Sequence, residues 1–244
     1  MNELSSLLKC VCFYEPHEEY LCVIQDNQMG LGGRRVVIIS MASIIENKRM
    51  DYEILILAIN IFDRFLSKIK VENLIRDVKV IGVGCIVLAD NVRSSLKIDS
   101  SELIEEELFT IECLESWVNI IKTSLNDDIY SIIASDIATA ILKSEVFEDT
   151  SDIEKFSILK EFKLLYCVII SHYKYLSICT REVTYVILKK ICVDDGDPDL
   201  DYLIVDTFLS LELKLLGCKT PNLYKDIIET IELETLFPHP LFRF

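Results

Sequence analysis

The segment from Tyr52 to Lys68 constrains the fold more than any other part of the sequence, because a helix formed here is apolar on nearly every side. Its apolar side chains are Ile54, Leu55, Ile56, Leu57, Ile59, Ile61, Phe62, Phe65 and Leu66. A helix without a polar face is normally surrounded by other helices, so we expect this segment to form the centre of a helical bundle. Asp51 is its predicted N-cap.

The rest of the chain also indicates helices. Its 244 residues include only 7 glycines and 5 prolines, and no proline lies between Pro16 and Pro198. A β protein of this length would need far more turn residues, so we predict an all-α fold. The apolar spacing predicts helices over residues 4–13, 35–45, 52–68, 77–92, 101–107 and 111–122, and then over 129–143, 153–173, 180–192 and 202–216.

These helices form two units in series. We predict an N-terminal helix and a glycine-rich hinge over residues 1–33, a first helical unit over 34–126, a second over 127–218 and a tail over 219–244. The hinge is Gly30-Leu31-Gly32-Gly33. It is not predicted to bind phosphate, because no strand precedes it and no Gly-Lys-Ser/Thr ends it. Gly82 and Gly84 are expected to let neighbouring helices approach closely.

No pattern in the sequence indicates catalysis, so we expect a protein that is not an enzyme and holds no metal or cofactor. The net charge of −15 argues against a nucleic-acid-binding surface. The nine cysteines suit buried free thiols in a reducing compartment, since no signal sequence is evident. The acidic run over 194–201 lacks the glycine and glutamate spacing of a calcium loop. The longest apolar run, Val80–Ala89, is too short to span a membrane.

Asp63, followed by Arg64, is an acid on an otherwise apolar helix. Burying a carboxylate is costly unless a cation or strong donors meet it. Arg35 lies near the start of the preceding predicted helix, and two consecutive antiparallel helices would bring the two positions together. We therefore predict a structural ion pair between Arg35 and Asp63.

The segment Ala58 to Ser67, A-I-N-I-F-D-R-F-L-S, resembles the central helix of the cyclin box, which reads approximately A-V-N-Y-L-D-R-F-L-S. Arg34-Arg35-Val36-Val37-Ile38 falls where cyclins show M-R-A-I-L. Val80-Ile81-Gly82 is similar to L-V-G, and Val87-Leu88-Ala89-Asp90-Asn91 occupies the position of L-L-A-S-K. The resemblance implies two tandem cyclin-like folds of about five helices each, with the second more divergent.

The resemblance also implies binding sites. Asn91, Glu115, Val87 and Asp90 are expected to bind a kinase, with Glu112 open as an alternative to Glu115. Asn91 stands where cyclins have lysine. Val36, Val37, Ile38 and Met41 are expected to form a substrate-docking patch that receives peptide motifs.

The function implied is a regulatory subunit that binds a cyclin-dependent kinase and promotes its active conformation, in the nucleus, the cytoplasm or both. The alternative is a cyclin-fold scaffold or transcription-type adaptor that no longer activates a kinase. Neither nucleic acid nor membrane is an expected partner.

Overall fold

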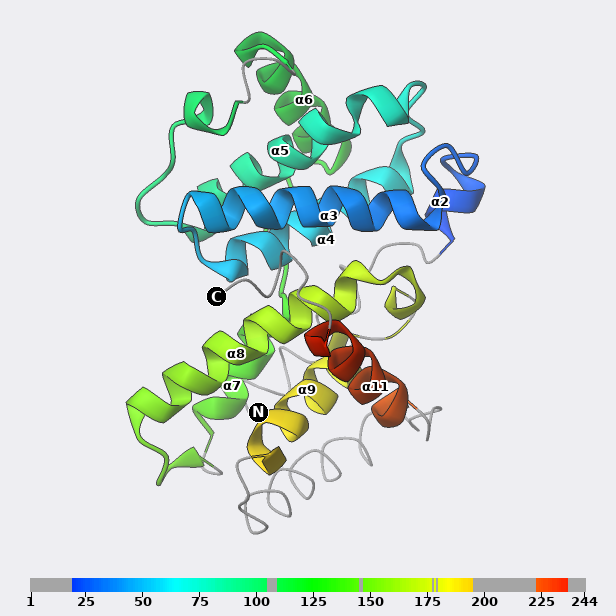
Figure 1. The fold of residues 1–244 in the computed structure, drawn as a ribbon. Coiled ribbons are helices and arrows are strands. Elements are labelled where there is room, and N and C mark those ends of the chain that lie inside the picture. The colour runs from blue at the N-terminus through cyan, green and yellow to red at the C-terminus, as the bar shows by residue number, and fades with distance from the viewer. Residues whose placement is uncertain are drawn as a thin grey trace. The chain divides into compact units, whose positions relative to one another are not determined.

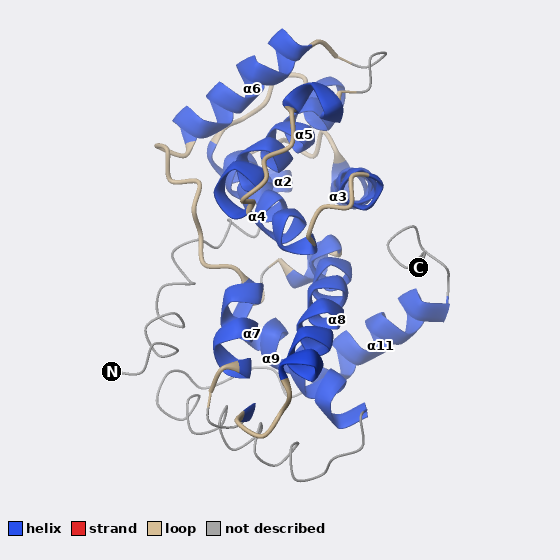
Figure 2. Cartoon of the chain, turned by 90° about the vertical axis from the view of Figure 1, so that its left-hand side faces the viewer, coloured by secondary structure: helices blue, strands red, loops and turns tan. Residues whose placement is uncertain are grey.

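The computed structural model describes residues 19–104, 109–144, 147–176, 178, 180–194 and 223–236, and all regular structure in these ranges is helical (Figure 1, Figure 2). The all-α prediction is confirmed. The helices are α2 (Tyr20–Val23), α3 (Gly30–Asn47), α4 (Tyr52–Lys68), α5 (Leu74–Arg93), α6 (Ile111–Ser124), α7 (Ala134–Leu142), α8 (Asp152–Ser171), α9 (Thr180–Asp194) and α11 (Leu223–Leu236), with 3-10 turns at Ser100–Leu103 and Tyr173–Tyr175.

Some predicted features lie outside these ranges. They are the helices over 4–13 and 202–216, and the acidic run beyond Asp194. Within the described ranges, no helix combines the length and apolar character needed to cross a membrane.

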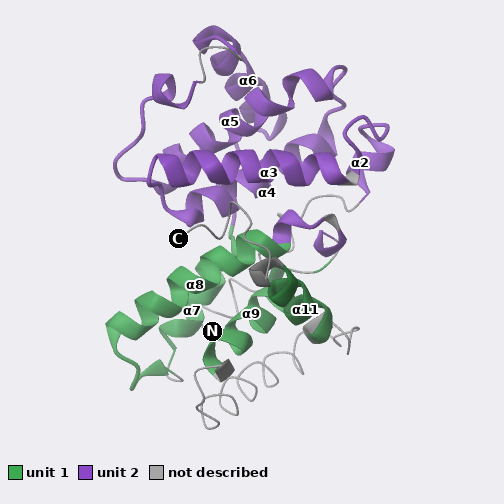
Figure 3. Cartoon of the chain, viewed as in Figure 1, with its two compact units in different colours: residues 1–13, 132–169, 178–244 green, residues 14–131, 170–177 purple. Residues whose placement is uncertain are grey.

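The chain divides into two compact units (Figure 3). Unit 2 comprises residues 14–131 and 170–177, and unit 1 comprises 1–13, 132–169 and 178–244. Unit 2 therefore contains α2 to α6, whereas α7, α9, α11 and nearly all of α8 belong to unit 1.

Helix α4 is the centre of unit 2, as its composition predicts. Its side chains from Ile54 to Leu66 are buried with the exception of Asn60. Helices α2, α3, α5 and α6 all contact it. The helix begins and ends at the predicted residues, and the Asp51 carboxylate accepts a hydrogen bond from the backbone N–H of Glu53, which confirms the predicted N-cap.

Two glycines of α5 allow the close helix packing predicted from the sequence. A Cβ added at Gly82 would lie 3.3 Å from Met41 Cγ on α3, and one at Gly84 would lie 3.2 Å from Ile121 Cδ1 on α6. Both distances are shorter than ordinary van der Waals contacts, so side chains at these positions would push the helices apart.

The predicted glycine hinge is wrong, because Gly30 to Gly33 form the first turn of α3. Gly30 has a φ of 63°, a conformation that glycine adopts without strain. Glycine's low helix propensity is a weak preference, and the packing of α3 inside unit 2 overrides it.

Helix α7 begins at Ala134, five residues later than predicted. The preceding segment is held in an irregular conformation by side chains of unit 2: Arg93 Nη2 donates to the carbonyl of Ser131, and Ser131 Oγ donates to Asn60 Oδ1. The predicted helix over 101–107 is reduced to the 3-10 turn Ser100–Leu103 in the part that the structure describes.

Candidate partner-binding site

A buried polar cluster lies between α2, α3 and α4. Arg34 donates from Nε to Asp63 Oδ1 at 2.8 Å and from Nη2 to Asp63 Oδ2 at 2.6 Å. The hydroxyl of Tyr20 also donates to Asp63 Oδ1, at 2.5 Å. All three side chains are almost completely removed from solvent. The carboxylate is thus met by a two-pronged guanidinium and a phenol, which compensates the cost of its burial.

The cluster shifts the ionisation of its members. Burial, together with the negative charge of Asp63, raises the pKa of Tyr20 well above its ordinary value. Burial on its own would lower the pKa of Arg34, but the charge and hydrogen bonds of Asp63 outweigh this effect and raise it. The folded protein therefore holds a charged Arg34 beside a neutral Tyr20.

The predicted partner of Asp63 was wrong by one residue, since the structure pairs it with Arg34 instead of Arg35. Successive residues of a helix point about 100° apart, so only one of two adjacent arginines can face α4. Arg34 is fully buried there, whereas Arg35 is partly exposed.

Further long bonds tie unit 2 together. Arg34 Nη1 donates to the carbonyls of Ile170 at 2.8 Å and Ser171 at 3.2 Å, two residues that belong to the same unit. Arg64, the neighbour of Asp63, donates from Nη2 to the carbonyl of Asp128 at 2.9 Å. The adjacent residues Asp63 and Arg64 therefore connect α4 to two different parts of unit 2, α3 and the segment at Asp128.

Two glutamines that the sequence analysis missed fasten the segment after α2 to the connection between α4 and α5. Gln25 Nε2 donates to the carbonyls of Leu66 and Ile69, and Gln25 Oε1 accepts from the N–H of Val71. Gln28 repeats the pattern: Nε2 donates to the carbonyl of Val71, and Oε1 accepts from the N–H of Leu74. No periodic pattern signals these residues, because each bonds to backbone groups more than forty residues later in the chain.

Helices α5 and α6 run in the same direction along their contact. Arg76 and Val80 of α5 and Cys113 and Trp117 of α6 line one cavity of about 440 Å³ in the first half of both helices. Further along, Gly84 lies against Val118 and Ile121. The pairing thus advances along both helices together.

This direction decides where the predicted kinase-binding residues lie. Asn91 and Glu115 are both exposed. Asn91 is seven residues, or about 10 Å, beyond Gly84 along α5. Glu115 precedes Val118 and therefore lies near the opposite end of the contact. The structure places both side chains on the surface of the α5–α6 pair but does not bring them together.

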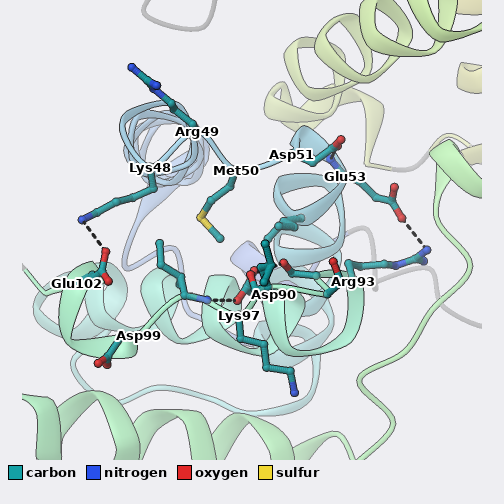
Figure 4. Close-up of a pocket in the computed structure, with 15 residues that line it drawn as sticks. Lys48, Arg49, Met50, Asp51, Glu53, Asp90, Arg93, Lys97, Asp99 and Glu102 are labelled. Carbon is teal, nitrogen blue, oxygen red and sulfur yellow. Dashed lines mark hydrogen bonds and ion pairs between the residues drawn. The ribbon is translucent and has the colours of Figure 1, made fainter.

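The other two predicted kinase-binding residues are buried, which contradicts their role as a contact surface. Val87 is only 9% exposed and Asp90 only 4%. The carboxylate of Asp90 accepts a hydrogen bond from the N–H of Ile98 at 2.9 Å and so holds the loop after α5 (Figure 4). The helix turns these two residues inward while Asn91, next in sequence, faces outward.

A polar pocket of about 550 Å³ adjoins that loop (Figure 4). Its acids are used within the unit: Glu53 pairs with Arg93 at 2.8 Å, and Glu102 pairs with Lys48 at 3.8 Å. These internal pairs leave the pocket without a set of convergent groups that would indicate one ligand. In the part of the chain that the structure describes, no group of three metal-ligating side chains occurs.

The predicted substrate-docking patch is also wrong as a surface. Val36 is 65% exposed, but Val37, Ile38 and Met41 are buried. Val37 and Met41 pack against Gly82 of α5. Three of the four residues thus belong to the core. The face of α3 that carries the buried Arg34 points inward and also carries these three residues, whereas the predicted patch required that face to point outward.

Comparison with known proteins identifies the family. The sequence profile of the family described as "Cyclin, N-terminal domain" matches residues 5–130, more than half of the chain. The chain belongs to the cyclin family, whose members are non-catalytic regulatory proteins.

Individual relatives are distant. The chain is 26% identical over 141 residues to G1/S-specific cyclin-D3 of Homo sapiens and to that of Bos taurus, and the match covers 57% of this chain and 47% of each relative. It therefore spans about half the length of these curated relatives. A solved structure, the X-ray structure of a viral cyclin from herpesvirus saimiri, superposes with a TM-score of 0.76 at 13% identity, covering 98% of this chain and 99% of that chain. The predicted fold of two cyclin units is confirmed.

Proposed function

We propose that the chain is a regulatory subunit that binds a cyclin-dependent protein kinase inside the cell and promotes the kinase's active conformation. The observation that supports this most is the α5–α6 pair, which belongs to a family-defining fold and carries Asn91 and Glu115 on its surface. Helix α5 is buried along most of its length, so the exposed residues project from a rigid support.

A subunit of this kind does no chemistry. It binds the kinase with the αC helix and the activation loop correctly placed, and so raises the population of that state. The shift can be no larger than the difference between its affinities for the active and inactive kinase.

One observation favours a second function, that of a scaffold which binds without activating. Asn91 is neutral, and it stands at the position where the cyclin motif L-L-A-S-K has a lysine. Hydrogen bonds to charged groups contribute about 1.5–3 kcal/mol, so a neutral amide would weaken kinase binding by about ten- to a hundredfold unless other contacts compensate.

Titration against a cyclin-dependent kinase by calorimetry, followed by a phosphorylation assay, tests both functions. Asn91→Lys should tighten binding by about tenfold. Asn47→Lys, which adds the same charge at an exposed site on α3, is the matched control and should leave affinity unchanged. Binding with no rise in phosphorylation would favour the scaffold, and no binding to any kinase tested would contradict the activating role.

Glu115→Ala adds a second measurement. Because Asn91 and Glu115 lie well apart, their substitutions should act additively on the binding free energy. A strong dependence of one effect on the other would show that the kinase brings the two sites into one contact.

A further inference from the structure

The first turn of α8 and the residue that follows it expose two large apolar side chains. Ile153 is 83% and Phe156 is 71% exposed, the highest values for large apolar residues in the described part of unit 1. They are three residues apart on one helix and therefore point to the same side. Contiguous exposed apolar groups of this kind mark interaction sites more often than single ones do.

This turn is held in place by a capping box. The backbone N–H and the hydroxyl of Ser151 both donate to Glu154 Oε2, at 2.9 and 2.7 Å, and the N–H of Glu154 donates back to Ser151 Oγ at 3.3 Å. Just before it, the fully buried Phe147 accepts a hydrogen bond at its carbonyl from the N–H of Thr150. Ile153 and Phe156 thus project from a preorganised turn, which lowers the entropy lost on binding.

The surroundings are acidic. Residues 147–157 contain four acids and one base, and the acids Glu148, Asp149, Asp152 and Glu154 are all exposed. Acids in the first turn of a helix favour its dipole, which accounts for Asp152 and Glu154. The dipole accounts neither for Glu148 and Asp149 nor for the two uncovered apolar side chains.

Charge decides which partner suits this surface. A second copy of the chain would bring like acids together, and nucleic acids and anionic membranes carry the same sign. A basic protein segment has the complementary charge. We propose that Ile153, Phe156 and the four acids form a docking surface for a lysine- or arginine-rich segment of a protein partner that also offers apolar side chains. This surface belongs to unit 1, whereas the α5–α6 pair belongs to unit 2, and the proposal does not rest on kinase binding.

The test uses the full chain and a fluorescein-labelled peptide, Lys-Leu-Lys-Lys-Leu-Leu-Lys, in an anisotropy titration. The double variant Ile153→Ser/Phe156→Ser should bind the peptide about tenfold more weakly or worse. Glu148→Lys/Asp149→Lys should weaken binding to a similar extent, and added salt should weaken the parent's binding. All four residues are exposed, so the variants should fold normally, which circular dichroism can confirm.

Leu233→Ser is the matched control, because it removes an exposed apolar side chain elsewhere in unit 1. Its affinity should stay at the parent's value. Equal peptide binding by the parent and the Ile153→Ser/Phe156→Ser variant would mean general attraction to an acidic protein and would overturn the proposal. Equal binding of Glu-Leu-Glu-Glu-Leu-Leu-Glu by the parent would also overturn it. So would self-association in sedimentation that Phe156→Ser abolishes, since the occupant would then be a second copy.

Discussion

Unit 2 buries charged and amide side chains that bond to residues far away in the sequence, whereas, apart from the phenol of Tyr166, the described part of unit 1 buries only small hydroxyl groups among its polar side chains. In unit 2 these residues are Gln25, Arg34, Asp63 and Arg64, whereas the buried Asp90 accepts a local bond from the N–H of Ile98. In unit 1 they are Ser135, Thr184 and Thr230, and both threonine hydroxyls donate to the carbonyl four residues earlier in their own helix.

The buried charges of unit 2 lie within residues 5–130, the part of the chain that the family profile matches. A buried carboxylate tolerates few alternatives, because removing its partner leaves an uncompensated charge. A threonine that bonds within its own helix can be exchanged for a small apolar residue at little cost. Replacing a buried polar side chain should therefore cost more stability in unit 2 than in unit 1.

The comparison predicts the largest effect for Arg34→Ala. Removing one member of a buried ion pair typically costs about 3–5 kcal/mol. Urea unfolding should show a loss of this size in the free energy of unfolding. Arg35→Ala, one residue along the same helix and partly exposed, is the control and should cost about 1 kcal/mol or less. Equal losses in the two variants would contradict the assignment of Arg34 to Asp63.

Tyr20→Phe should have the next largest effect. It removes one hydrogen bond to the Asp63 carboxylate and keeps the aromatic ring, so the expected loss is about 1.5–3 kcal/mol. The same urea titration measures it. A variant as stable as the parent would show that Arg34 alone satisfies the carboxylate.

Alkaline pH should reveal the raised pKa of Tyr20. The folded state keeps the phenol of Tyr20 neutral, whereas the unfolded chain ionises it above a pKa of about 10. The stability of the fold is therefore unaffected by this group below about pH 10 and decreases as the pH rises above it. The parent should then lose about 1.4 kcal/mol per pH unit more steeply than Tyr20→Phe. The buried thiol of Cys85, whose pKa is also raised by burial, titrates in both proteins and cancels. Parallel pH profiles would refute the prediction.

Thr184→Val in unit 1 should have the smallest effect. Its hydroxyl donates to the carbonyl of Thr180, four residues earlier in the same helix. This bond connects two residues that the helix itself already holds close together. Replacement by an isosteric apolar group should change the free energy of unfolding by about 1 kcal/mol or less, in either direction. A loss as large as that of Arg34→Ala would erase the contrast between the two units.

The sequence predicted the elements whose signals are local and strong. The bounds of α4, the N-cap Asp51 and the close approach at Gly82 and Gly84 all follow from composition, capping chemistry or side-chain size. The rotation of α3 did not follow, because its start is a run of glycines that carries no helix signal. Its two adjacent arginines are also equivalent until the helix is placed.

The predicted kinase-binding role of Val87 and Asp90 was wrong for a related reason. Asp90 and Asn91 are neighbours in the sequence, and only the packing of α5 decides which of them faces solvent. The roles of Gln25 and Gln28 could not be predicted from the sequence. A glutamine whose side chain bonds to distant backbone N–H and carbonyl groups cannot be distinguished, in a sequence, from a glutamine on the surface.

The bonds of Gln25 and Gln28 have a consequence for amide hydrogen exchange. The N–H groups of Val71 and Leu74 lie in a connection and at the start of a helix, where amides usually exchange quickly with solvent. Here each N–H is held by a glutamine side chain from more than forty residues earlier. Slow exchange at these two positions would therefore report, in a single spectrum, whether the segment that follows α2 is seated on the rest of unit 2.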